Sequence, residues 1–537
     1  MTLAPLDVAL IGYQDQGNLG MGYLAAAVHV RGHRVEMFDI RDGVDRIVER
    51  FEGHSPLVIG FSLIFQAFLP QFRKFALELR AAGIVSHFTM GGHFASLCHE
   101  EALAHFPEIN SVVRYEGEQT LVELVERVKA RADWRNLDGI AYLDAGNVVT
   151  NPARALVPDL DSLPFPYRPY EPERMGGFAT LPVLASRGCA RTCSFCSIHT
   201  FYRTAPGKVV RVRKPAKVVE EMLDLERKYG VRVFLFQDDD FPLWKAVGRR
   251  WATELAARLH ESGLAERAIW KISCRAEYVE PELFAMLRDA GLFLVYMGIE
   301  SGTEAGLDVL HKQISAERNL EAIETLKRLG IAFGYGFMLF DPSTTFESIR
   351  ENLHFLRKMV GDGTAGAVFS RMLPYGGTPI RDQLQKEGRL RGDITRPDYV
   401  FLDPRINDFH RQLVGLVRPW VHGEGLSYQL SYVVDEFEMI CRLVPGVTGG
   451  EAYRASLKAL TRQSNERLLG LVEHFAESFA AGDPSVPDRD EISDYCETSI
   501  ARLREVRNQF VAENVYLLRD ASEAACPSGP VLAPQVH

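Results

Sequence analysis

The stretch Ser186-Arg187-Gly188-Cys189-Ala190-Arg191-Thr192-Cys193-Ser194-Phe195-Cys196 places three cysteines in the spacing C-x3-C-x2-C. Thiolates are soft ligands that suit iron–sulfur clusters and zinc. A cubane cluster needs one ligand on each of its four irons, so three cysteines leave one iron open to bind a small molecule and pass it an electron. A structural zinc site with His199 as fourth ligand is the alternative, but structural zinc ligands usually come as two separated pairs.

Downstream of these cysteines, apolar runs alternate with helical patterns. Such alternation predicts a partial barrel of six β/α units, whose chemistry lies at the carboxyl ends of the strands. The expected strands are Leu181–Ser186, Val231–Gln237, Ala268–Cys274, Phe293–Ile299, Ile331–Phe340 and Ala365–Met372.

Polar residues gather where these strands end. The second strand leads into Asp238-Asp239-Asp240-Phe241, and three adjacent acids predict a ligand ammonium group or buried hydrogen bonds. Arg275 follows the third strand and could hold a carboxylate through two hydrogen bonds, whereas Cys274 is expected to be a small core residue. The fourth strand ends in Gly298-Ile299-Glu300-Ser301-Gly302.

The first 150 residues also alternate between strands and helices, which predicts a parallel, doubly wound sheet. Ligands of such sheets bind outside the carboxyl ends of the strands. Gly17-Asn18-Leu19-Gly20-Met21-Gly22 reads G-x-x-G-x-G, which does not match the dinucleotide fingerprint. A flavodoxin-like domain without a nucleotide is therefore one interpretation.

The cysteine stretch resembles the cluster loop of radical S-adenosylmethionine (SAM) enzymes, including the aromatic residue before the third cysteine. The strand-end motifs follow in that family's order, and Leu373-Pro374-Tyr375-Gly376-Gly377-Thr378-Pro379 resembles its P-x-P-G-T-P motif with Gly376 in place of the second proline. The resemblance implies a [4Fe-4S] cluster on Cys189, Cys193 and Cys196, whose open iron chelates SAM and cleaves it to a 5'-deoxyadenosyl radical. It implies SAM-binding roles for Phe195, Asp238, Asp239, Arg275, Glu300, Ser301 and Phe337.

The N-terminal domain resembles the cobalamin-binding domain fused to radical SAM enzymes, through motifs such as Asn18-Leu19-Gly20, Gly91-Gly92-His93 and Glu116-Gly117-Glu118. Paired glycines would let a corrin tail approach the backbone closely. The D-x-H-x-x-G motif that supplies a cobalt ligand in cobalamin mutases is absent, so His93 is expected to contact cobalamin without ligating cobalt. The resemblance implies cobalamin-binding roles for Gly12, Tyr13, Leu19, Gly20, Ser62, Leu63, Gly91, Gly92, His93, Glu116, Gly117 and Glu118.

The rest of the chain completes a three-domain prediction. Six prolines between Asn151 and Pro172 predict an extended linker. After about residue 385 the pattern becomes helical, either as a packing domain or as a lid that shapes the substrate pocket. The expected parts are a Rossmann-like cobalamin-binding domain (1–150), a proline-rich linker (151–178), a radical SAM partial TIM barrel (179–385), a helical C-terminal domain (386–524) and a disordered tail (525–537).

Composition limits the partners. A net charge of −10 argues against a general nucleic-acid binder. The basic run from Arg203 to Lys217 is expected to be a solvated loop, or else a rim that attracts an anionic substrate or an acidic electron donor. Few cysteines, no signal peptide and no apolar span predict a cytoplasmic protein without a membrane segment.

Taken together, these features predict a cobalamin-dependent radical SAM C-methyltransferase. It would act on an unactivated carbon of a small-molecule, natural-product type substrate, using methylcobalamin and an external one-electron reductant of the flavodoxin or ferredoxin type. One alternative is a cyclase or rearrangement enzyme with the same cofactors and no methyl transfer. An alternative of another class is a cobalamin sensor with a structural metal site.

Overall fold

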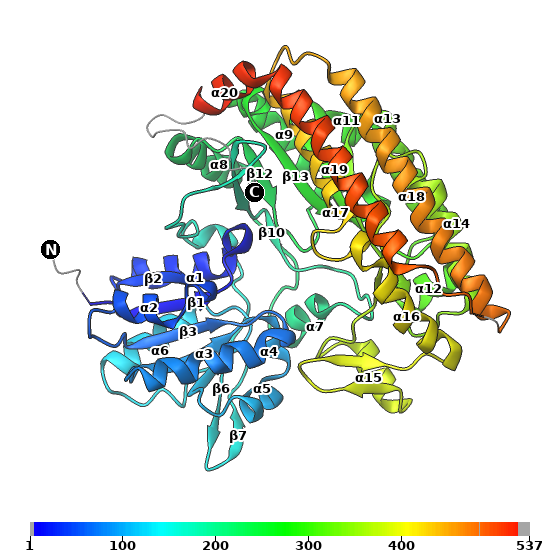
Figure 1. Ribbon diagram of the computed structural model, residues 1–537. Coiled ribbons are helices and arrows are strands. Elements are labelled where there is room, and N and C mark those ends of the chain that lie inside the picture. The colour runs from blue at the N-terminus through cyan, green and yellow to red at the C-terminus, as the bar shows by residue number, and fades with distance from the viewer. Residues whose placement is uncertain (1–4, 483, 525–537) are drawn as a thin grey trace. The chain divides into compact units, whose positions relative to one another are not determined.

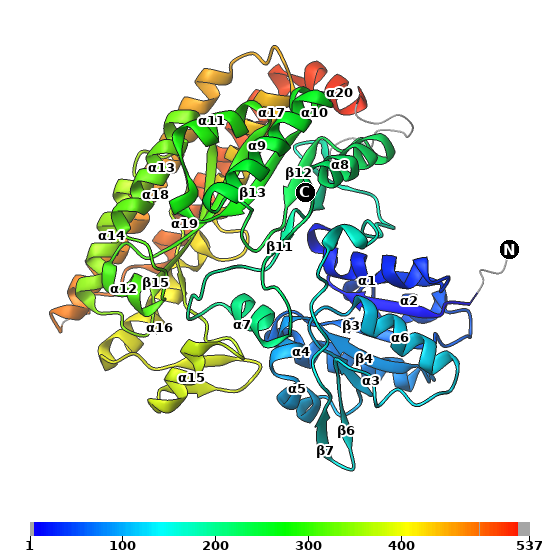
Figure 2. The ribbon, with the colours of Figure 1, turned by 180° about the vertical axis from the view of Figure 1, so that it is seen from behind.

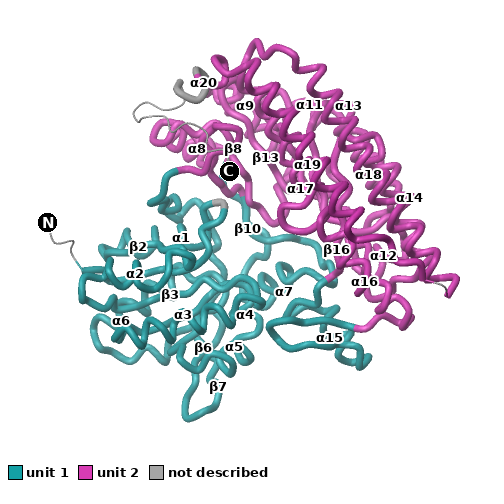
Figure 3. Tube along the Cα trace, in the orientation of Figure 1, with its two compact units in different colours: residues 1–171, 186–214, 373–399 teal, residues 172–185, 215–372, 400–537 magenta. Residues whose placement is uncertain are grey.

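The computed structural model describes residues 5–482 and 484–524, so the tail predicted to be disordered lies outside the described residues. The chain forms two compact units that alternate along the sequence (Figure 3). Unit 1 comprises Met1–Glu171, Ser186–Lys214 and Leu373–Tyr399, and unit 2 comprises Pro172–Ala185, Pro215–Met372 and Val400–His537. The domain boundaries predicted from the sequence stay predictions.

Unit 1 is built on a seven-stranded sheet of order β2-β1-β3-β4-β5-β6-β7 (Figure 1). The first five strands pair in parallel, and β6 and β7 add an antiparallel hairpin at one edge. The order 2-1-3-4-5 is the flavodoxin-like doubly wound topology, whose ligand crevice lies at the carboxyl ends of β1 and β3. The strands are β1 Val8–Gly12, β2 Val35–Asp39, β3 Val58–Ser62, β4 His87–Gly91, β5 Ser111–Val113, β6 Ile140–Asp144 and β7 Asn147–Thr150.

Helices cover both faces of this sheet. Alternate residues of β1 point to opposite cores, with Val8 and Leu10 packed beneath α1 and α6, and Ala9 and Ile11 packed beneath α2 to α5. Two short helices follow β4 in place of one long helix, because the backbone leaves the helical region at Cys98. The helices are α1 Leu19–Val30, α2 Val44–Arg50, α3 Leu69–Ala81, α4 His93–Leu97, α5 His99–His105 and α6 Glu118–Lys129.

The cysteine segment belongs to unit 1. Two short antiparallel strands, β10 (Ser186–Arg187) and β11 (Arg211–Val212), bracket it, and α7 (Ser197–Thr204) lies between them. A small core made of Tyr115, Leu156, Phe201, Tyr202 and Ala205 ties α7 to the rest of the unit. Unit 1 also includes α15 (Pro379–Lys386) and the hairpin of β17 (Leu390–Gly392) and β18 (Pro397–Tyr399).

Unit 2 contains a second sheet, of order β16-β15-β14-β13-β12-β9-β8. Six of its strands run parallel and form the curled half-barrel that the sequence predicts, and β8 adds an antiparallel edge. The strands are β8 Glu173–Met175, β9 Phe178–Val183, β12 Val233–Phe236, β13 Ile269–Cys274, β14 Leu292–Glu300, β15 Ala332–Phe340 and β16 Ser370–Arg371.

The sixth parallel strand is much shorter than the predicted Ala365–Met372. Its backbone bonds to side chains in place of a neighbouring strand: Ala367 N–H donates to Asn465 Oδ1 at 2.7 Å, and Val368 N–H donates to the Tyr335 hydroxyl at 3.1 Å. That hydroxyl donates in turn to Gly366 O at 2.9 Å. Side chains therefore take up the backbone hydrogen-bonding groups of this segment, and only Ser370 and Arg371 pair with β15.

The C-terminal helices belong to unit 2 and pack on its barrel (Figure 2). Arg442 on α17 donates to the carbonyls of Leu292 at 3.2 Å and Gly330 at 3.1 Å, which fixes that helix beside β14 and β15. Within the described residues, no helix combines the length and apolar character needed to cross a membrane. The helices are α8 Pro215–Tyr229, α9 Lys245–Glu261, α10 Leu264–Arg267, α11 Pro281–Asp289, α12 Glu304–Val309, α13 Ala316–Leu329, α14 Phe346–Val360, α16 Pro404–Val421, α17 Leu426–Leu443, α18 Gly450–Ala480, α19 Arg489–Glu513 and α20 Val515–Ala524.

Candidate functional site

The three predicted cluster ligands lie on one irregular loop between β10 and α7. Cys193 is 9% exposed, and Cys189 and Cys196 are half-buried. Turn contacts shape the loop: Arg191 N–H donates to the Cys189 sulfur at 3.5 Å, and Cys196 N–H donates to Cys193 O at 3.2 Å. Phe195, assigned to SAM from the sequence, is half-buried on the same loop.

The donor set fits a [4Fe-4S] cluster by its chemistry. Three thiols fall within one loop that is neither sealed in the core nor fully exposed, so they can reach a cluster that also binds a small molecule. Among the described residues, no group of three or more His, Cys, Asp or Glu side chains, the three cysteines included, is arranged as a metal-binding set. The three cysteines therefore stay predicted cluster ligands, and His199 stays the predicted fourth ligand of the zinc alternative.

The predicted cobalamin residues line the carboxyl edge of the first sheet. Gly12 ends β1 and Ser62 ends β3, and a Cβ at Gly12 would lie 3.0 Å from the Cβ of Ser62. Gly92 has φ +109°, and a Cβ there would overlap the Leu63 carbonyl. The glycine at 92 is therefore required by this chain's own backbone, in addition to any approach of a corrin. Leu63 itself is fully buried.

Loop residues extend this edge. Leu19 is buried at the start of α1, whereas Gly20 beside it is exposed. Gly91 ends β4 and Gly117 precedes α6, and a Cβ on Gly117 would lie 3.0 Å from Val113 Cγ1. His93 begins α4 and packs its ring against Phe201 of α7 at 4.5 Å. His93 therefore contacts the helix that follows the cysteines.

Exposed aromatic residues cover the same edge, and the sequence analysis named only one of them. Tyr13 follows β1 and packs on Phe68, with ring centroids 4.7 Å apart. Ile64, Phe65 and Phe68, which follow β3, are 39%, 49% and 37% exposed. Clustered exposed apolar side chains at a ligand edge indicate a binding surface.

Glu116 and Glu118, both assigned to cobalamin from the sequence, bind protein groups. Arg211 Nη1 donates to Glu116 Oε2 at 2.7 Å, and Arg187 Nη2 donates to Glu118 Oε1 at 2.7 Å. Burial alone would raise the pKa of Glu116, but the charges of Arg187 and Arg211 hold that pKa below its usual value. These carboxylates face the cluster segment and not an open ligand surface.

The basic run that follows the cysteines is only partly a charged rim. Arg211 is 2% exposed and pairs with Glu116, and Arg213 is 4% exposed and lies 3.9 Å from Asp161. Arg203 and Lys208 remain exposed. The expectation of a solvated loop is therefore wrong for the two buried arginines, because they bind acids inside unit 1.

Gly376, the position that departs from the family's P-x-P-G-T-P motif, has a local explanation. Its N–H donates to Gln66 Oε1 at 2.8 Å, and Gln66 Nε2 donates to Ile394 O at 2.5 Å. A proline would lack that N–H, and any Cβ would overlap the sulfur of Cys98. Glycine at this position lets the segment 373–399 dock on Gln66.

In unit 2, the acids after β12 divide between interior and solvent. Asp238 is buried and accepts from Ala185 N–H at 3.2 Å, and Asp240 accepts from the Tyr278 hydroxyl at 3.5 Å. Asp239 is exposed. Buried hydrogen bonds, one of the two predicted solutions for these acids, therefore hold two of the three.

Glu300 occupies the most distinctive backbone position of the barrel. It has φ +67°, and the pairing of β14 with β15 shifts register between Gly298 and Glu300. A left-handed non-glycine residue stores strain that surrounding structure must hold, and such residues cluster at functional sites. The Glu300 carboxylate lies 3.6 Å from Lys312 Nζ and above Gly298 and Gly336, which are too small to cover it.

Three other residues assigned to SAM have protein partners. Arg275 Nε donates to Glu277 at 2.6 Å, and its Nη2 donates to the Lys312 carbonyl. Arg275 could therefore bind a ligand carboxylate through two hydrogen bonds only by giving up these partners. Ser301 is fully buried and donates to Asn352 Oδ1 at 3.3 Å. Phe337 is 2% exposed and stacks on Phe355 of α14, on the helix-covered face of the sheet. Both side chains contact partners within the chain, and their assignment to SAM stays a prediction.

The face of the sheet opposite α9, α11, α13 and α14 carries polar residues that the sequence analysis missed. Lys271 Nζ donates to Ser273 Oγ at 3.1 Å and lies 5.7 Å from the ring centroid of Tyr296. Tyr296 is 42% exposed although it lies in the middle of the sheet, next to Gly334 and Gly336. Burial raises the pKa of Asp435 on α17 to about 7, and Glu438 acts in the same direction while Lys271 opposes it.

These omissions have a recognisable sequence signal. Lys271 and Ser273 alternate with Trp270, Ile272 and Cys274, which are buried on the helix side. A polar residue at every second position of an internal barrel strand indicates an inner face that binds something. Asp435 lies on α17, and no local pattern connects it to the strands.

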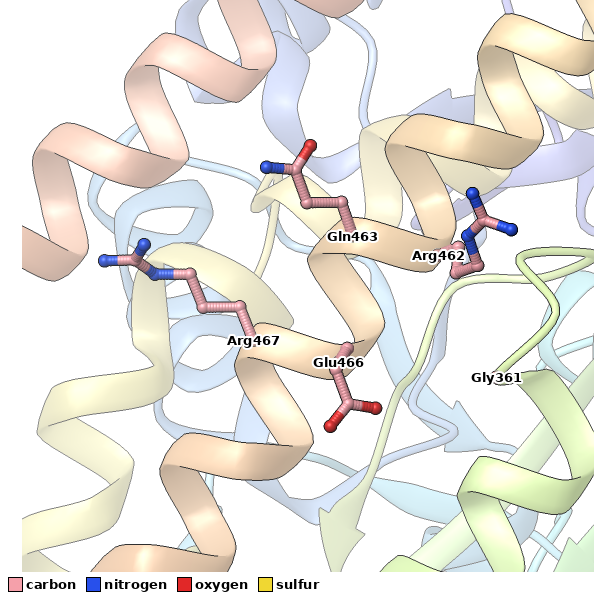
Figure 4. A pocket seen from close by; sticks show the side chains of 5 residues that line it. All are labelled: Gly361, Arg462, Gln463, Glu466 and Arg467. Atoms are coloured by element: carbon pink, nitrogen blue, oxygen red, sulfur yellow. The ribbon is translucent and has the colours of Figure 1, made fainter.

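A hollow on the surface of α18 lies apart from these residues (Figure 4). Two of its three charged members are already paired, since Arg467 lies 2.6 Å from Glu491 and Glu466 lies 3.5 Å from Arg357. It has no nucleophile and no group typical of catalysis, so we assign it no chemistry. Its lining residues are Gly361, Arg462, Gln463, Glu466 and Arg467.

Two protein families match the two halves of this architecture. The B12 binding domain matches residues 8–125, and the radical SAM superfamily matches residues 183–356. The first range contains the carboxyl-edge loops of unit 1, and the second contains the cysteine loop and the four barrel strands β12 to β15.

Similar proteins share this combination. An uncharacterized methyltransferase of Pyrococcus horikoshii is 28% identical over 67% of this chain and 77% of its own length. An anaerobic magnesium-protoporphyrin IX monomethyl ester cyclase of Cereibacter sphaeroides is 30% identical over 56% of this chain, and the match spans 48% of that cyclase. The cobalamin-dependent SAM radical enzyme OxsB, solved with aqua-cobalamin and SAM bound, has the same fold, with a TM-score of 0.66 at 17% identity over 97% of this chain and 83% of OxsB.

Proposed function

The chain belongs to the cobalamin-dependent radical SAM enzymes, and on that premise we propose that it methylates an unactivated carbon of a small-molecule, natural-product type substrate. Its cofactors are a [4Fe-4S] cluster, SAM and cobalamin. When bound, these groups supply a 5'-deoxyadenosyl radical that removes a hydrogen atom and a cobalamin methyl group that replaces it. The observation that carries the proposal is the union of a B12-binding domain and a radical SAM domain in a chain similar to methyltransferases.

The proposed roles of the chain's own residues follow from their placement. Cys189, Cys193 and Cys196 would hold three irons. The carboxyl edge of the first sheet, with its exposed aromatic residues, would bind cobalamin. Glu300 combines strained backbone with a buried carboxylate at the end of β14, which supports an interaction with the SAM ammonium group.

The inner face of the barrel supports a small-molecule substrate. Lys271, Tyr296 and Asp435 offer a cation, a hydroxyl and a carboxyl group in unit 2, and the Tyr296 ring lies against Gly334 and Gly336. Polar groups of this kind orient a ligand whose remaining surface is apolar. An external one-electron reductant of the flavodoxin or ferredoxin type would complete the reaction.

The second candidate is a cyclase or rearrangement enzyme with the same cofactors. The 30% identity to the magnesium-protoporphyrin ester cyclase of Cereibacter sphaeroides favours it, although the match spans about half of that cyclase. A cobalamin sensor with a structural metal site is not retained, because residues 183–356 form a radical SAM domain.

Product analysis separates the two candidates. The anaerobically reconstituted protein would be incubated with cobalamin, a reductant, candidate substrates and SAM carrying a deuterated methyl group. Methylation yields a product heavier by one labelled methyl group, with S-adenosylhomocysteine and 5'-deoxyadenosine. Deoxyadenosine with an unlabelled product would contradict methylation and support the cyclase.

A pair of cysteine variants provides the control. Cys196→Ala removes a predicted cluster ligand and should abolish deoxyadenosine formation. Cys441→Ala changes a half-buried cysteine on α17, far along the chain from the cluster loop, and should leave that activity within about twofold. Equal loss in both variants would point to damaged folding and not to a lost ligand.

A further inference from the structure

Two arginines close the base of the loop that carries the cysteines. Arg187 ends β10, two residues before Cys189, and Arg211 begins β11 after α7. The antiparallel register pairs these two residues directly. The segment 188–210, called the cluster loop below, therefore leaves and returns to unit 1 at one point, and both arginines stand there.

Both arginines bind the loop that follows β5. Arg187 donates from Nη1 to Glu116 Oε1 at 3.1 Å and from Nη2 to Glu118 Oε1 at 2.7 Å, so one guanidinium spans two carboxylates. Arg211 Nη1 donates to both oxygens of Glu116, at 2.9 and 2.7 Å. Val157 N–H adds a fourth contact to Glu116 at 2.7 Å. We call Glu116, Glu118, Arg187 and Arg211 the carboxylate–arginine network.

This network is buried. The side chains of Arg211 and Glu116 are 2% and 5% exposed, and those of Arg187 and Glu118 are 10% and 8% exposed. The Arg187 guanidinium also lies over Tyr23 at 4.7 Å, and that of Arg211 lies over Tyr202 of α7 at 5.3 Å. Buried charges persist only when they are paired, so removal of one member leaves its partner unsatisfied. The network thus permits one arrangement of the two strands that bracket the cysteines.

A second contact supports the same arrangement. Phe201 on α7 packs against His93 at 4.5 Å and Tyr115 at 5.3 Å, and both of these residues follow strands of the first sheet. The cluster loop is therefore held at its base by charge and along α7 by aromatic packing. The partners Glu116, Glu118, His93 and Tyr115 all lie within residues 8–125, the part of unit 1 that matches the B12 binding domain.

We propose that Glu116 and Glu118 are positioning residues for the cluster loop, through Arg187 and Arg211. The loop after β5 serves the cluster side of the protein, and the corrin contacts fall to the other loops of the same edge. Contacts from the B12-binding domain then fix the positions of the three cysteines. This inference concerns the assembly of the cluster site and does not depend on which reaction the enzyme catalyses.

The test compares two glutamates on the same helix. Glu118→Gln breaks the pair with Arg187, and Glu126→Gln is the matched control, because Glu126 pairs with Arg31 on the exposed side of α6. Iron and sulfide per chain are measured after anaerobic reconstitution, with the EPR spectrum of the dithionite-reduced protein in the presence and absence of SAM. Hydroxocobalamin binding is measured on the same samples by absorbance.

We expect Glu118→Gln to lower cluster content at least twofold or to change the EPR signal, with cobalamin affinity within twofold of wild type. Glu126→Gln should match wild type in every readout. Loss of cobalamin binding with an unchanged cluster would overturn the proposal and return Glu118 to the corrin. Cluster readouts equal to those of Glu126→Gln would also overturn it.

A double variant keeps the test valid if the single variant fails to fold. Glu118→Gln with Arg187→Met removes both partners, so no unpaired charge remains in the interior. A folded double variant with altered cluster EPR and intact cobalamin binding supports positioning. A folded double variant with a wild-type cluster overturns it, since the pair would then be needed for stability alone.

Discussion

Two carboxylates in this protein, Glu116 and the half-buried Asp435, have pKa values shifted in opposite directions by their surroundings. In unit 1, Glu116 accepts hydrogen bonds from Arg187, Arg211 and Val157, and these hold its pKa below the usual value against the effect of burial. In unit 2, Asp435 has only the more distant charge of Lys271 to offset burial, which raises its pKa to about 7. Glu116 accepts hydrogen bonds from within the chain, whereas no hydrogen bond to the Asp435 carboxyl is found among the described residues.

The difference separates architecture from binding surface. A fully paired acid stabilises the fold and leaves no capacity for a ligand, whereas an acid without a close partner remains available to one. Glu300, with Lys312 at 3.6 Å, lies between these extremes. The more strongly an acidic residue is paired within the chain, the more we expect its substitution to change stability, and the less we expect it to change ligand binding.

The largest effect is expected at the paired end. Arg211→Gln removes the guanidinium that binds both oxygens of Glu116, and we expect a loss of about 3–5 kcal/mol in the free energy of unfolding, measured by urea denaturation. Because the folded pKa of Glu116 is depressed, its contribution is present above the unfolded pKa and is lost as pH falls through the folded pKa. The difference between variant and wild type should therefore shrink in acid.

Arg31→Gln is the control for that prediction. Arg31 pairs with Glu126 at 2.8 Å, but both side chains are largely exposed, at 59% and 41%. Exposed pairs contribute about 0–1 kcal/mol. Equal losses of unfolding free energy in the two variants would show that burial does not strengthen the contribution of the carboxylate–arginine network to stability.

A smaller effect is expected at the intermediate acid. Glu300→Gln should weaken SAM binding to the reconstituted protein about tenfold, which corresponds to about 1.4 kcal/mol, and should lower the unfolding free energy by about 1–3 kcal/mol because it leaves the buried Lys312 ammonium without its carboxylate. Equilibrium dialysis with labelled SAM measures the first quantity. Glu347→Gln, at a side chain 73% exposed on α14, is the control. Unchanged SAM affinity in Glu300→Gln would remove Glu300 from the binding site.

The sequence predicted the strands and the ends that carry chemistry, because their signals are local. Alternating apolar runs located both sheets, and C-x3-C-x2-C located the cluster loop. The left-handed Glu300 falls within the predicted Gly298–Gly302 motif, where small flanking residues permit its conformation. A backbone motif of this kind is visible in one stretch of residues.

The direction of side chains could not be predicted, because it depends on distant partners. In the sequence, Glu116 and Glu118 look like acids of a ligand-binding loop. In the structure they pair with Arg187 and Arg211, which come from another part of the chain. Phe337 follows a glycine-rich strand, yet its ring faces Phe355 because successive strand residues point to opposite faces. The shortened β16 has the same origin, since Asn465 and Tyr335 take its backbone groups.

At the unpaired end, pH should reveal Asp435. Its folded pKa of about 7 exceeds the unfolded value of about 3.9, so the unfolded state ionises first and this group lowers stability as pH rises from about 4 to 7. Asp435→Asn removes that penalty. We expect the variant to be about 1 kcal/mol more stable than wild type at pH 8 and equal to it near pH 4, a value reduced because the carboxyl stays partly open to solvent.

Thermal unfolding across this pH range measures the effect, with Glu438→Gln as a neighbouring comparison. Glu438 pairs with Arg454 at 3.0 Å, so its loss should not stabilise the protein at pH 8. A stability difference between Asp435→Asn and wild type that is the same at pH 4 and pH 8 would show that Asp435 does not titrate in this range.

The smallest effect is expected at Tyr296, whose neighbour in the sheet supplies the contrast. The Tyr335 hydroxyl donates to Gly366 O at 2.9 Å and accepts from Val368 N–H at 3.1 Å, so Tyr335→Phe should lose about 1–3 kcal/mol. Tyr296 is 42% exposed, and among the described residues its hydroxyl has no hydrogen-bond partner, so Tyr296→Phe should stay within about 0.5 kcal/mol of wild type. The Tyr296 hydroxyl makes no hydrogen bond to the described residues that would stabilise the fold. A loss of product formation in Tyr296→Phe with unchanged SAM cleavage would therefore indicate that this hydroxyl contacts the substrate. A large loss of stability in Tyr296→Phe would instead place this side chain with Tyr335 and Glu116 in the architecture of the protein.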